Sequence, residues 1–200
     1  MHVTTFRRLA LTAATAIMPA LLTPVQAQEA ADPQAARIAK AREAIKGLGE
    51  GLKEKLLGAM KEGGPVAALD VCKVEAPKIA AERSAAAGLE VGRTALKVRN
   101  PANAPSETER KVLEDFAKQI AGGADSAKLE HVAVVEEGGK KSFLYMKPIM
   151  TAGKPCLACH GSELDPAVAA KIKELYPSDQ ATGFNAGDLR GAFVVTGKVE

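Results

Sequence analysis

Residues 155–161 read Pro-Cys-Leu-Ala-Cys-His-Gly, and the rest of the chain is best interpreted outward from this stretch. Its two cysteines are separated by two residues, which places both sulfurs on one side of a single turn. Each sulfur can then add to one vinyl group of the same porphyrin, and the adjacent histidine can supply a nitrogen to the iron. The spacing predicts a covalent haem c attachment site at Cys156, Cys159 and His160.

A zinc site and a redox-active dithiol are the two other interpretations of this motif. Zinc takes four ligands, and downstream of residue 27 the chain offers only Cys72 and His131 as further soft or borderline donors. A thioredoxin-like dithiol begins a helix directly after an early strand, whereas this motif lies late in the chain between Pro155 and Gly161. Haem c is therefore the favoured interpretation.

The first 27 residues have the composition of an export signal. Arg7 and Arg8 form a positive start, residues 9–22 are an apolar run, and Val25-Gln26-Ala27 fits a small-residue cleavage site. We expect a mature, periplasmic chain that begins at Gln28. An uncleaved anchor is the alternative, but the run is shorter than the about 20 residues of a membrane span and is interrupted by proline.

The charge balance of the chain bears on the kind of partner it can bind. The chain has 27 basic and 24 acidic side chains, and cleavage of the signal removes two arginines and no acid, which leaves a net charge of about +1. Such a balance gives no reason to expect a nucleic-acid partner.

The chain has three cysteines. With two of them used in thioethers, Cys72 is left as a single thiol in an oxidising compartment.

The segment from 28 to 62 is expected to be helical and to precede a haem domain at 63–200. Apolar residues recur at three- and four-residue spacing over 32–60, Asp32 can cap the helix, and Pro33 suits its first turn. Three glycines within 47–51 predict a bend or break there. This amphipathic helix is expected to pack on the domain, and a homodimer through it is the alternative.

A second helix is expected to begin at Pro65, after Gly63-Gly64. Its apolar stripe comprises Val66, Leu69, Cys72, Ala76 and Ile79. Cys72 therefore points toward the core, although a cysteine at such a position is often only a small core residue. Pro77 has no amide hydrogen and its ring collides with the Lys73 carbonyl, so we expect a kink or break one turn beyond Cys72.

The remaining chain mixes strand and helix patterns and predicts an α+β fold. Ser106 and Glu109 form a capping-box pattern for a helix that ends at Gly122-Gly123, and Asp165-Pro166 begins another. The strand patterns cover 89–100, 131–135, 142–146 and 191–199, with a hairpin turn over 136–141.

The first strand pattern places three cations on one face, at Arg93, Lys97 and Arg99. Guanidinium groups pair with carboxylates through two hydrogen bonds, so this face can receive haem propionates. A solvated strand face is an equally good interpretation.

Several stretches resemble a family of exported haem c domains long catalogued as of unknown function. They are Val91-Gly92-Arg93-Thr94, Leu96 through Pro105, Cys72 with Ala76-Pro77, Cys156 through Gly161, Tyr176-Pro177, and Gly187-Asp188-Leu189-Arg190-Gly191. The resemblance covers nearly the whole mature chain. Ala95 stands where the family usually has Ser, and residues 106–109 lack the usual tryptophan.

The resemblance implies a PAS-like fold, with a small antiparallel sheet and helices packed around a haem. It also implies a role in sensing or redox signalling, and iron ligation by His160 and by Cys72. Many relatives precede membrane and kinase modules, which this sequence does not contain.

The order of residues bears on the sixth iron ligand independently of the resemblance. The upstream candidates are Met60, Cys72, His131, Met146 and Met150, because no Met, His or Cys follows His160. A small all-helical cytochrome c has the opposite order, with its haem motif early and its methionine late. Cys72 is favoured because it alone combines a core-facing stripe with a nearby helix interruption. An open or methionine-ligated site is the alternative.

Two functions are consistent with one covalent haem. In the first, the domain senses redox state or a diatomic gas, which displaces Cys72 and shifts its helix. In the second, the protein is a periplasmic electron carrier that passes electrons between partner proteins. We expect no enzymatic activity, since a peroxidase would need an open site with a distal acid or base and the sequence offers only His131.

Overall fold

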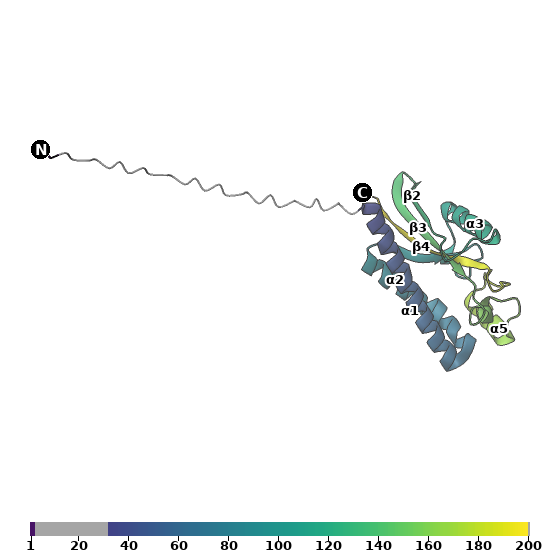
Figure 1. The fold of residues 1–200 in the computed structure, drawn as a ribbon. Helices are drawn as coiled ribbons and strands as arrows, with labels where there is room; N and C mark the ends of the chain where they lie inside the picture. Colours follow the sequence, from purple (N-terminus) through teal and green to yellow (C-terminus); the bar gives the residue numbers. More distant parts are fainter. Residues whose placement is uncertain (3–31, 200) are drawn as a thin grey trace. The chain divides into compact units, whose positions relative to one another are not determined.

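A computed structural model describes residues 1–2 and 32–199, and the folded part begins at Asp32 (Figure 1). The predicted n-region, apolar run and cleavage site lie outside the described residues. Within the described part, none of the helices combines the length and apolar composition needed to cross a membrane.

Four antiparallel strands form one sheet in the order β1-β4-β3-β2. They are β1 (Glu90–Thr94), β2 (His131–Glu137), β3 (Lys140–Met150) and β4 (Leu189–Lys198). The β2–β3 turn consists of two glycines with positive φ, 59° at Gly138 and 74° at Gly139, as tight hairpins of this kind require. Together with the helices, this sheet confirms the α+β prediction.

The strand expected over 89–100 is wrong beyond Thr94. Pairing of β1 with β4 ends where Thr94 faces Ala192, and Gly191 then lies so close that an added Cβ would be 2.4 Å from the Thr94 carbonyl oxygen. Farther on, the Val98 carbonyl accepts a hydrogen bond from Gln180 in a loop rather than from a strand. Alternating polarity does not show whether the backbone has a strand partner. In this stretch it does not show burial either, because Arg99 is buried whereas Leu96 and Val98 are half-buried.

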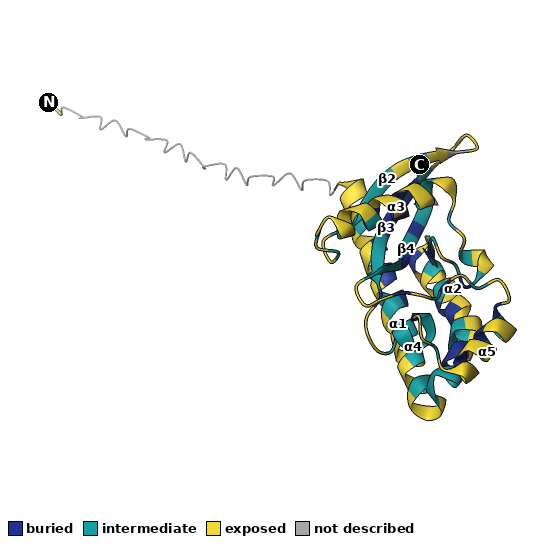
Figure 2. Cartoon of the chain, turned by 90° about the vertical axis from the view of Figure 1, so that its right-hand side faces the viewer, coloured by how far each residue is buried: buried dark blue, intermediate teal, exposed yellow. Residues whose placement is uncertain are grey.

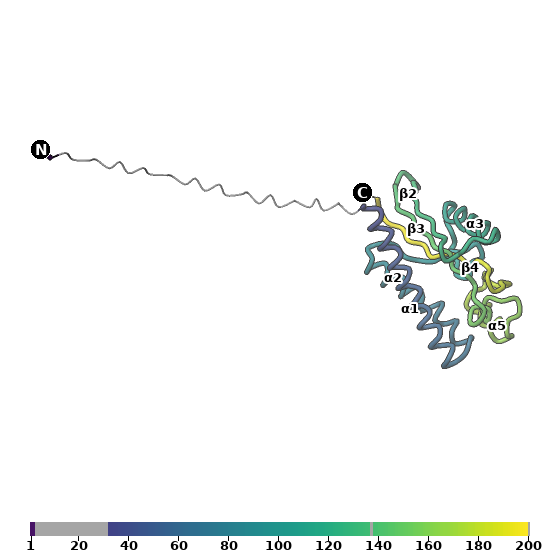
Figure 3. The backbone as a smooth tube through the Cα atoms, in the orientation of Figure 1, coloured from purple at the N-terminus to yellow at the C-terminus, as the bar shows by residue number. Residues whose placement is uncertain are grey.

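Helix α1 (Pro33–Asp70) begins as predicted, with Asp32 accepting a hydrogen bond from the Gln34 amide. Its one non-helical residue is Gly64, at φ 69° and ψ −165°, where the chain doubles back on itself (Figure 3). The turn expected at Gly63-Gly64 is therefore present.

The bend or break expected at the three glycines within 47–51 is wrong, because the helical backbone is continuous there. The missing side chains instead allow close packing. An added Cβ at Gly49 would lie 3.2 Å from the Phe193 ring, and one at Gly51 would lie 3.2 Å from Ile79. Glycine is used here to bring the first arm of α1 against β4 and against the returning helix.

The returning helix contains a π-helical turn, Val71–Glu75, before α2 (Ala76–Ala87). The Ala76 amide donates to the Val71 carbonyl, five residues back, instead of to Cys72. Pro77 follows immediately and has no amide to offer to Lys73, so the wider turn avoids a clash that an α-turn would create. The predicted irregularity is present, and it falls on the turn that holds Cys72 itself.

Helices cover both faces of the sheet, and buried residues gather along β3 and β4 (Figure 2). On one face α1 and α2 pack in a cluster that includes Leu48, Phe143, Tyr145 and Val195. On the other face α3 (Glu107–Ala121), which has the predicted Ser106/Glu109 capping box, packs in a cluster that includes Phe116. The result is the small antiparallel sheet flanked by helices that the resemblance implied, with a long N-terminal helix.

Candidate haem site

The Cys-x-x-Cys-His stretch forms one helical turn, α4 (Leu157–His160), preceded by Cys156. The His160 amide donates to the Cys156 carbonyl at 2.9 Å, which fixes the two cysteines on the same turn. Both thiols are free and half-buried. Gly161 ends the turn, and an added Cβ there would lie 2.7 Å from the Leu157 carbonyl oxygen, so the chain can leave this turn only at a residue without a side chain.

The His160 ring is held by one of its two nitrogens. Nδ1 lies 2.7 Å from the Ala181 carbonyl oxygen, so it carries the proton and donates it, while Nε2 has no hydrogen-bond partner within the described residues. Phe184 meets the ring edge-on with centroids 6.3 Å apart. Burial lowers the pKa of His160 to about 3, and the charges of Arg190 and Arg99 add to this effect. At neutral pH the imidazole is uncharged, with a free lone pair on Nε2.

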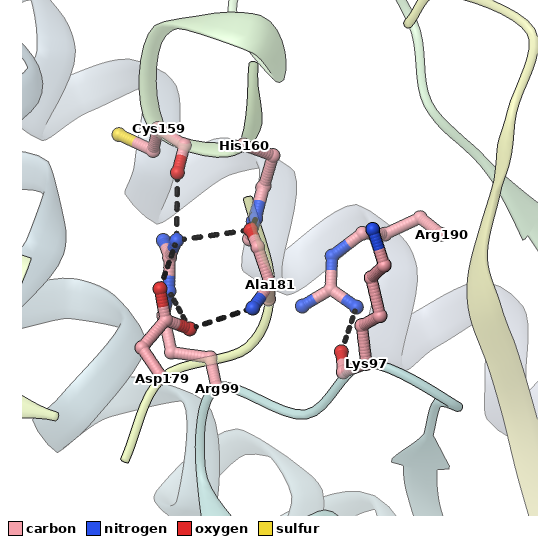
Figure 4. Close-up of polar contacts among 7 residues, drawn as sticks. All are labelled: Lys97, Arg99, Cys159, His160, Asp179, Ala181 and Arg190. Carbon is pink, nitrogen blue, oxygen red and sulfur yellow. Dashed lines mark hydrogen bonds and ion pairs between the residues drawn. The ribbon is translucent and has the colours of Figure 1, made fainter. Parts of the chain in front are cut away.

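A buried arginine connects this turn to the loop that holds the histidine (Figure 4). Arg99 Nη2 donates to the Cys159 carbonyl at 2.7 Å and to the Ala181 carbonyl at 3.2 Å. The Asp179 carboxylate accepts from Arg99 Nε at 3.0 Å and from Nη2 at 3.2 Å. The side chains of Arg99 and Asp179 are only 7% and 8% exposed, so both charges depend on each other for compensation.

Cys72 comes to the same site from the other end of the sequence. The helical turn before it contributes Leu69 to a buried cluster with α5 (Pro166–Leu175), and Cys159 packs against that cluster. Burial raises the pKa of the Cys159 thiol, Arg99 opposes this, and the nearby Cys72 and Cys156 raise it further. The structure thus brings Cys72 near Cys159 of the motif, although no local signal in the sequence links the two.

The three cations predicted to share a strand face have different surroundings in the structure. Arg99 is buried in its ion pair, and the Lys97 ammonium lies over the Phe184 ring, 5.2 Å from its centroid. Burial lowers the pKa of Arg93, whereas nearby Cys72 raises it. Arg93 therefore remains near the thiols, while Arg99 is committed to Asp179.

Two charged residues of the site were not singled out from the sequence, Asp179 and Arg190. Arg190 donates to the Lys97 carbonyl at 3.2 Å, and its guanidinium lies 5.3 Å from the Phe184 centroid, so Phe184 is flanked by two cations. Burial, with Arg99 and Arg93 nearby, lowers the pKa of Arg190 to about 10. Both residues lie in loop sequence or at a strand start without a periodic pattern, and only the family resemblance over Gly187 through Gly191 pointed toward this region.

The other candidates for a sixth ligand lie elsewhere in the fold. Met146 is fully buried in the cluster under α3, and His131 faces it across the β2–β3 ladder. Met150 ends β3, and Met60 lies on the first arm of α1. Among the five, Cys72 is close enough to Cys159 of the motif to raise the pKa of that thiol.

The donor set fits a covalently attached haem. Two free thiols with two residues between them can supply thioether sulfurs, and a neutral imidazole with an open Nε2 can supply one iron ligand. A third thiol close by is available as a second ligand. Haem iron takes at most two ligands from the protein, and this half-buried site can supply two, the His160 imidazole and the third thiol.

The fold and the site define a class: small α+β proteins in which a half-buried Cys-x-x-Cys-His turn accompanies an antiparallel sheet. The model of the Tll0287-like family (Tll0287) matches residues 24–197, and the chain belongs to this family. A solved structure described as that of the cyanobacterial heme-protein Tll0287 is similar, with a TM-score of 0.61 and 30% sequence identity. The alignment covers 85% of this chain and 98% of that one. Among curated proteins none matches.

Proposed function

We propose that this protein is an exported monohaem cytochrome of the c type, acting as a redox or gas sensor. Cys156 and Cys159 would form the two thioethers, and His160 and Cys72 would bind the iron. The observation that carries the proposal is the His160 Nε2 lone pair, which is left open beside two free thiols on a half-buried turn. The similar solved structure is that of a heme-protein, which supports the same cofactor.

In this proposal some residues attach the haem covalently, and others orient or supply the iron ligands. In each thioether the thiol adds across one vinyl group, with sulfur bonding to carbon and the thiol hydrogen passing to the neighbouring carbon. The Ala181 carbonyl keeps the His160 proton on Nδ1 and so orients Nε2 for coordination. A Cys72 thiolate is an anionic, strong donor, so we expect a midpoint potential well below that of a site ligated by histidine and methionine.

A sensor needs a ligand that can be displaced, and the turn around Cys72 supports this role. The π-turn leaves the Cys72 carbonyl without the amide of Ala76, and Lys73 and Val74 beside it are exposed. A shift between π and α register would move the thiol without unfolding the helix. Reduction weakens thiolate binding, which couples ligand loss to redox state.

Electron transfer is the second candidate. The motif residues from Pro155 through His160 are all half-buried rather than enclosed, so a haem attached there would present an edge to a redox partner. In this case Cys72 stays bound in both oxidation states. Periplasmic localisation is part of the proposal, with no nucleic-acid partner and no catalytic activity. A homodimer through α1 is the alternative to a helix that only packs on its own domain.

The deciding experiment is an absorption spectrum of the reduced protein with and without carbon monoxide. Rapid formation of a carbon monoxide complex supports a displaceable ligand and the sensor role, whereas an inert spectrum supports the carrier. Intact mass spectrometry and acid-acetone extraction test the common premise. A processed chain plus one haem that resists extraction is expected, and a haem that is stripped away would refute covalent attachment.

A further inference from the structure

The Ala181 carbonyl oxygen accepts hydrogen bonds from two groups. One is His160 Nδ1 at 2.7 Å, and the other is Arg99 Nη2 at 3.2 Å (Figure 4). A hydrogen bond from the ring N–H makes an imidazole a stronger metal donor, because the acceptor draws the proton away from the ring. A cation at the same oxygen withdraws its electron density. Ala181 is therefore a weaker acceptor for His160 than a carbonyl with one donor would be.

Asp179 opposes this effect from the same loop. Its Oδ1 accepts from Arg99 Nε at 3.0 Å and also from the Ala181 amide at 3.0 Å. The carboxylate thus neutralises the guanidinium and fixes the residue whose carbonyl holds the histidine. Because both side chains are more than nine-tenths buried, solvent screens neither charge strongly.

The same guanidinium also binds the Cys159 carbonyl at 2.7 Å. It therefore joins the α4 turn to the 179–181 loop and fixes the orientation of the His160 imidazole relative to that loop. Arg190 is the other cation facing the ring, but its hydrogen bond goes to the Lys97 carbonyl and not into this network.

We propose that Arg99 and Asp179 are positioning residues that set the donor strength of His160 in opposite directions. This inference rests on the proposed function, in which His160 binds the haem iron. Arg99 weakens the donor and adds a buried positive charge, so it favours ferrous iron and raises the midpoint potential. Asp179 compensates that charge and lowers the potential.

The test is the midpoint potential of the full-length, haem-loaded protein, measured by spectroelectrochemical titration. Arg99→Gln should lower it and Asp179→Asn should raise it, each changing the ferric-to-ferrous ratio at a fixed applied potential about tenfold, or about 59 mV for one electron. The double variant should return close to the parent value, because both charges are then absent.

Matched control variants distinguish the effect of a lost charge on the midpoint potential from the effect of a disturbed fold. Arg42→Gln and Glu130→Gln remove an arginine–carboxylate pair between α1 and the start of β2, and they should leave the potential unchanged. Arg99→Lys keeps the charge and should stay closer to the parent than Arg99→Gln does. Circular dichroism and covalent haem content verify folding, and if Arg99→Gln does not fold, Asp179→Asn and Arg99→Lys carry the test.

Shifts of the same sign in Arg99→Gln and Asp179→Asn would overturn the inference, because loosened packing or added solvent affects both variants alike. Unchanged potentials, or a shift in Arg99→Lys equal to that in Arg99→Gln, would also overturn it. Failure of the proposed function looks different: the parent protein itself would then lack an attached haem or a His160-dependent spectrum.

Discussion

The two sides of the site are built differently. His160 ends α4 and is held by the loop that contains Gly183 and Phe184. The His160 carbonyl accepts a hydrogen bond from the Phe184 amide at 3.0 Å, and the Gly161 carbonyl accepts one from the Gly183 amide at 3.0 Å. The His160 ring is also bound to the Ala181 carbonyl. Cys72 lies on a π-turn beside exposed residues, and its side chain has no hydrogen bond within the described part of the chain. One proposed ligand is fixed by surrounding structure, whereas the other depends on the register of its own helix.

This difference indicates how a haem domain can respond without losing its cofactor. Local motions occur where few hydrogen bonds and contacts must be broken, so displacement should occur on the Cys72 side. The thioethers and His160 would keep the haem in place meanwhile. The following predictions test that contrast, beginning with the largest effect.

Replacing both motif cysteines, Cys156→Ser with Cys159→Ser, should abolish covalent attachment completely. Serine cannot form a thioether, so acid-acetone should extract all haem from the variant and none from the parent. Single replacements should leave one thioether and an altered absorption band. Covalent haem retained in the double variant would show that attachment occurs elsewhere.

Cys72→Ser should keep the covalent haem but abolish a thiolate-type low-spin ferric signal in electron paramagnetic resonance. The midpoint potential should also rise, because an anionic donor that stabilises ferric iron is lost. The replacement is nearly isosteric, so the fold should be unaffected. A ferric spectrum equal to that of the parent would place the sixth ligand elsewhere, with Met146 and His131 as the next variants to make.

Pro77→Ala should have a smaller effect on the same side. Alanine restores an amide that can donate to the Lys73 carbonyl, which favours α over π register and moves Cys72. We expect a partial change in the ferric spectrum, seen as a second species rather than a lost signal. Pro166→Ala is the matched control, since Pro166 is exposed in the first turn of α5, where no helical hydrogen bond is gained. An unchanged spectrum would separate the helix irregularity from the site.

Much of the fold followed from local signals in the sequence. The capping box at Ser106/Glu109, the turn at Gly63-Gly64 and the Asp32-Pro33 helix start each involve residues within one turn, so their spacing alone was informative. The glycines within 47–51 misled because their role is contact with Phe193 and Ile79, which are distant in sequence. Residues 95–100 misled because their partner is a loop.

In the site, too, local patterns could be predicted from the sequence, whereas contacts between distant residues could not. The Cys-x-x-Cys-His turn is local, and it could be identified from five residues. The partnership of Arg99 with Asp179 spans 80 residues of sequence and has no spacing rule, so the three cations of the strand pattern could not be distinguished. Only the structure distinguishes Arg99, which pairs with Asp179, from Arg93, which lies near Cys72.

The smallest expected effect concerns how the helix that leads to Cys72 is anchored at its other end. Glu130 accepts hydrogen bonds from Arg42 on α1 and, at 2.9 Å, from the buried Tyr145 hydroxyl on β3. The hydrogen bond from Arg42 is the main cause of a Glu130 pKa below its usual range. A carboxylate with a lowered folded pKa contributes stability above its unfolded pKa and loses it as pH falls through the folded value.

The parent should therefore lose a small increment of unfolding free energy below about pH 4.3, the ordinary glutamate pKa, as the solution is acidified. The increment should be below about 1 kcal/mol, since the Arg42 partner is mostly exposed to solvent. Glu130→Gln should flatten this part of the stability-versus-pH curve in urea titrations, with Glu54→Gln at an exposed position of α1 as control. If the curve keeps its slope in Glu130→Gln, the anchor does not contribute. If the variant also alters the ferric spectrum, the Cys72 side is coupled to the whole length of the helical hairpin rather than to its own turn.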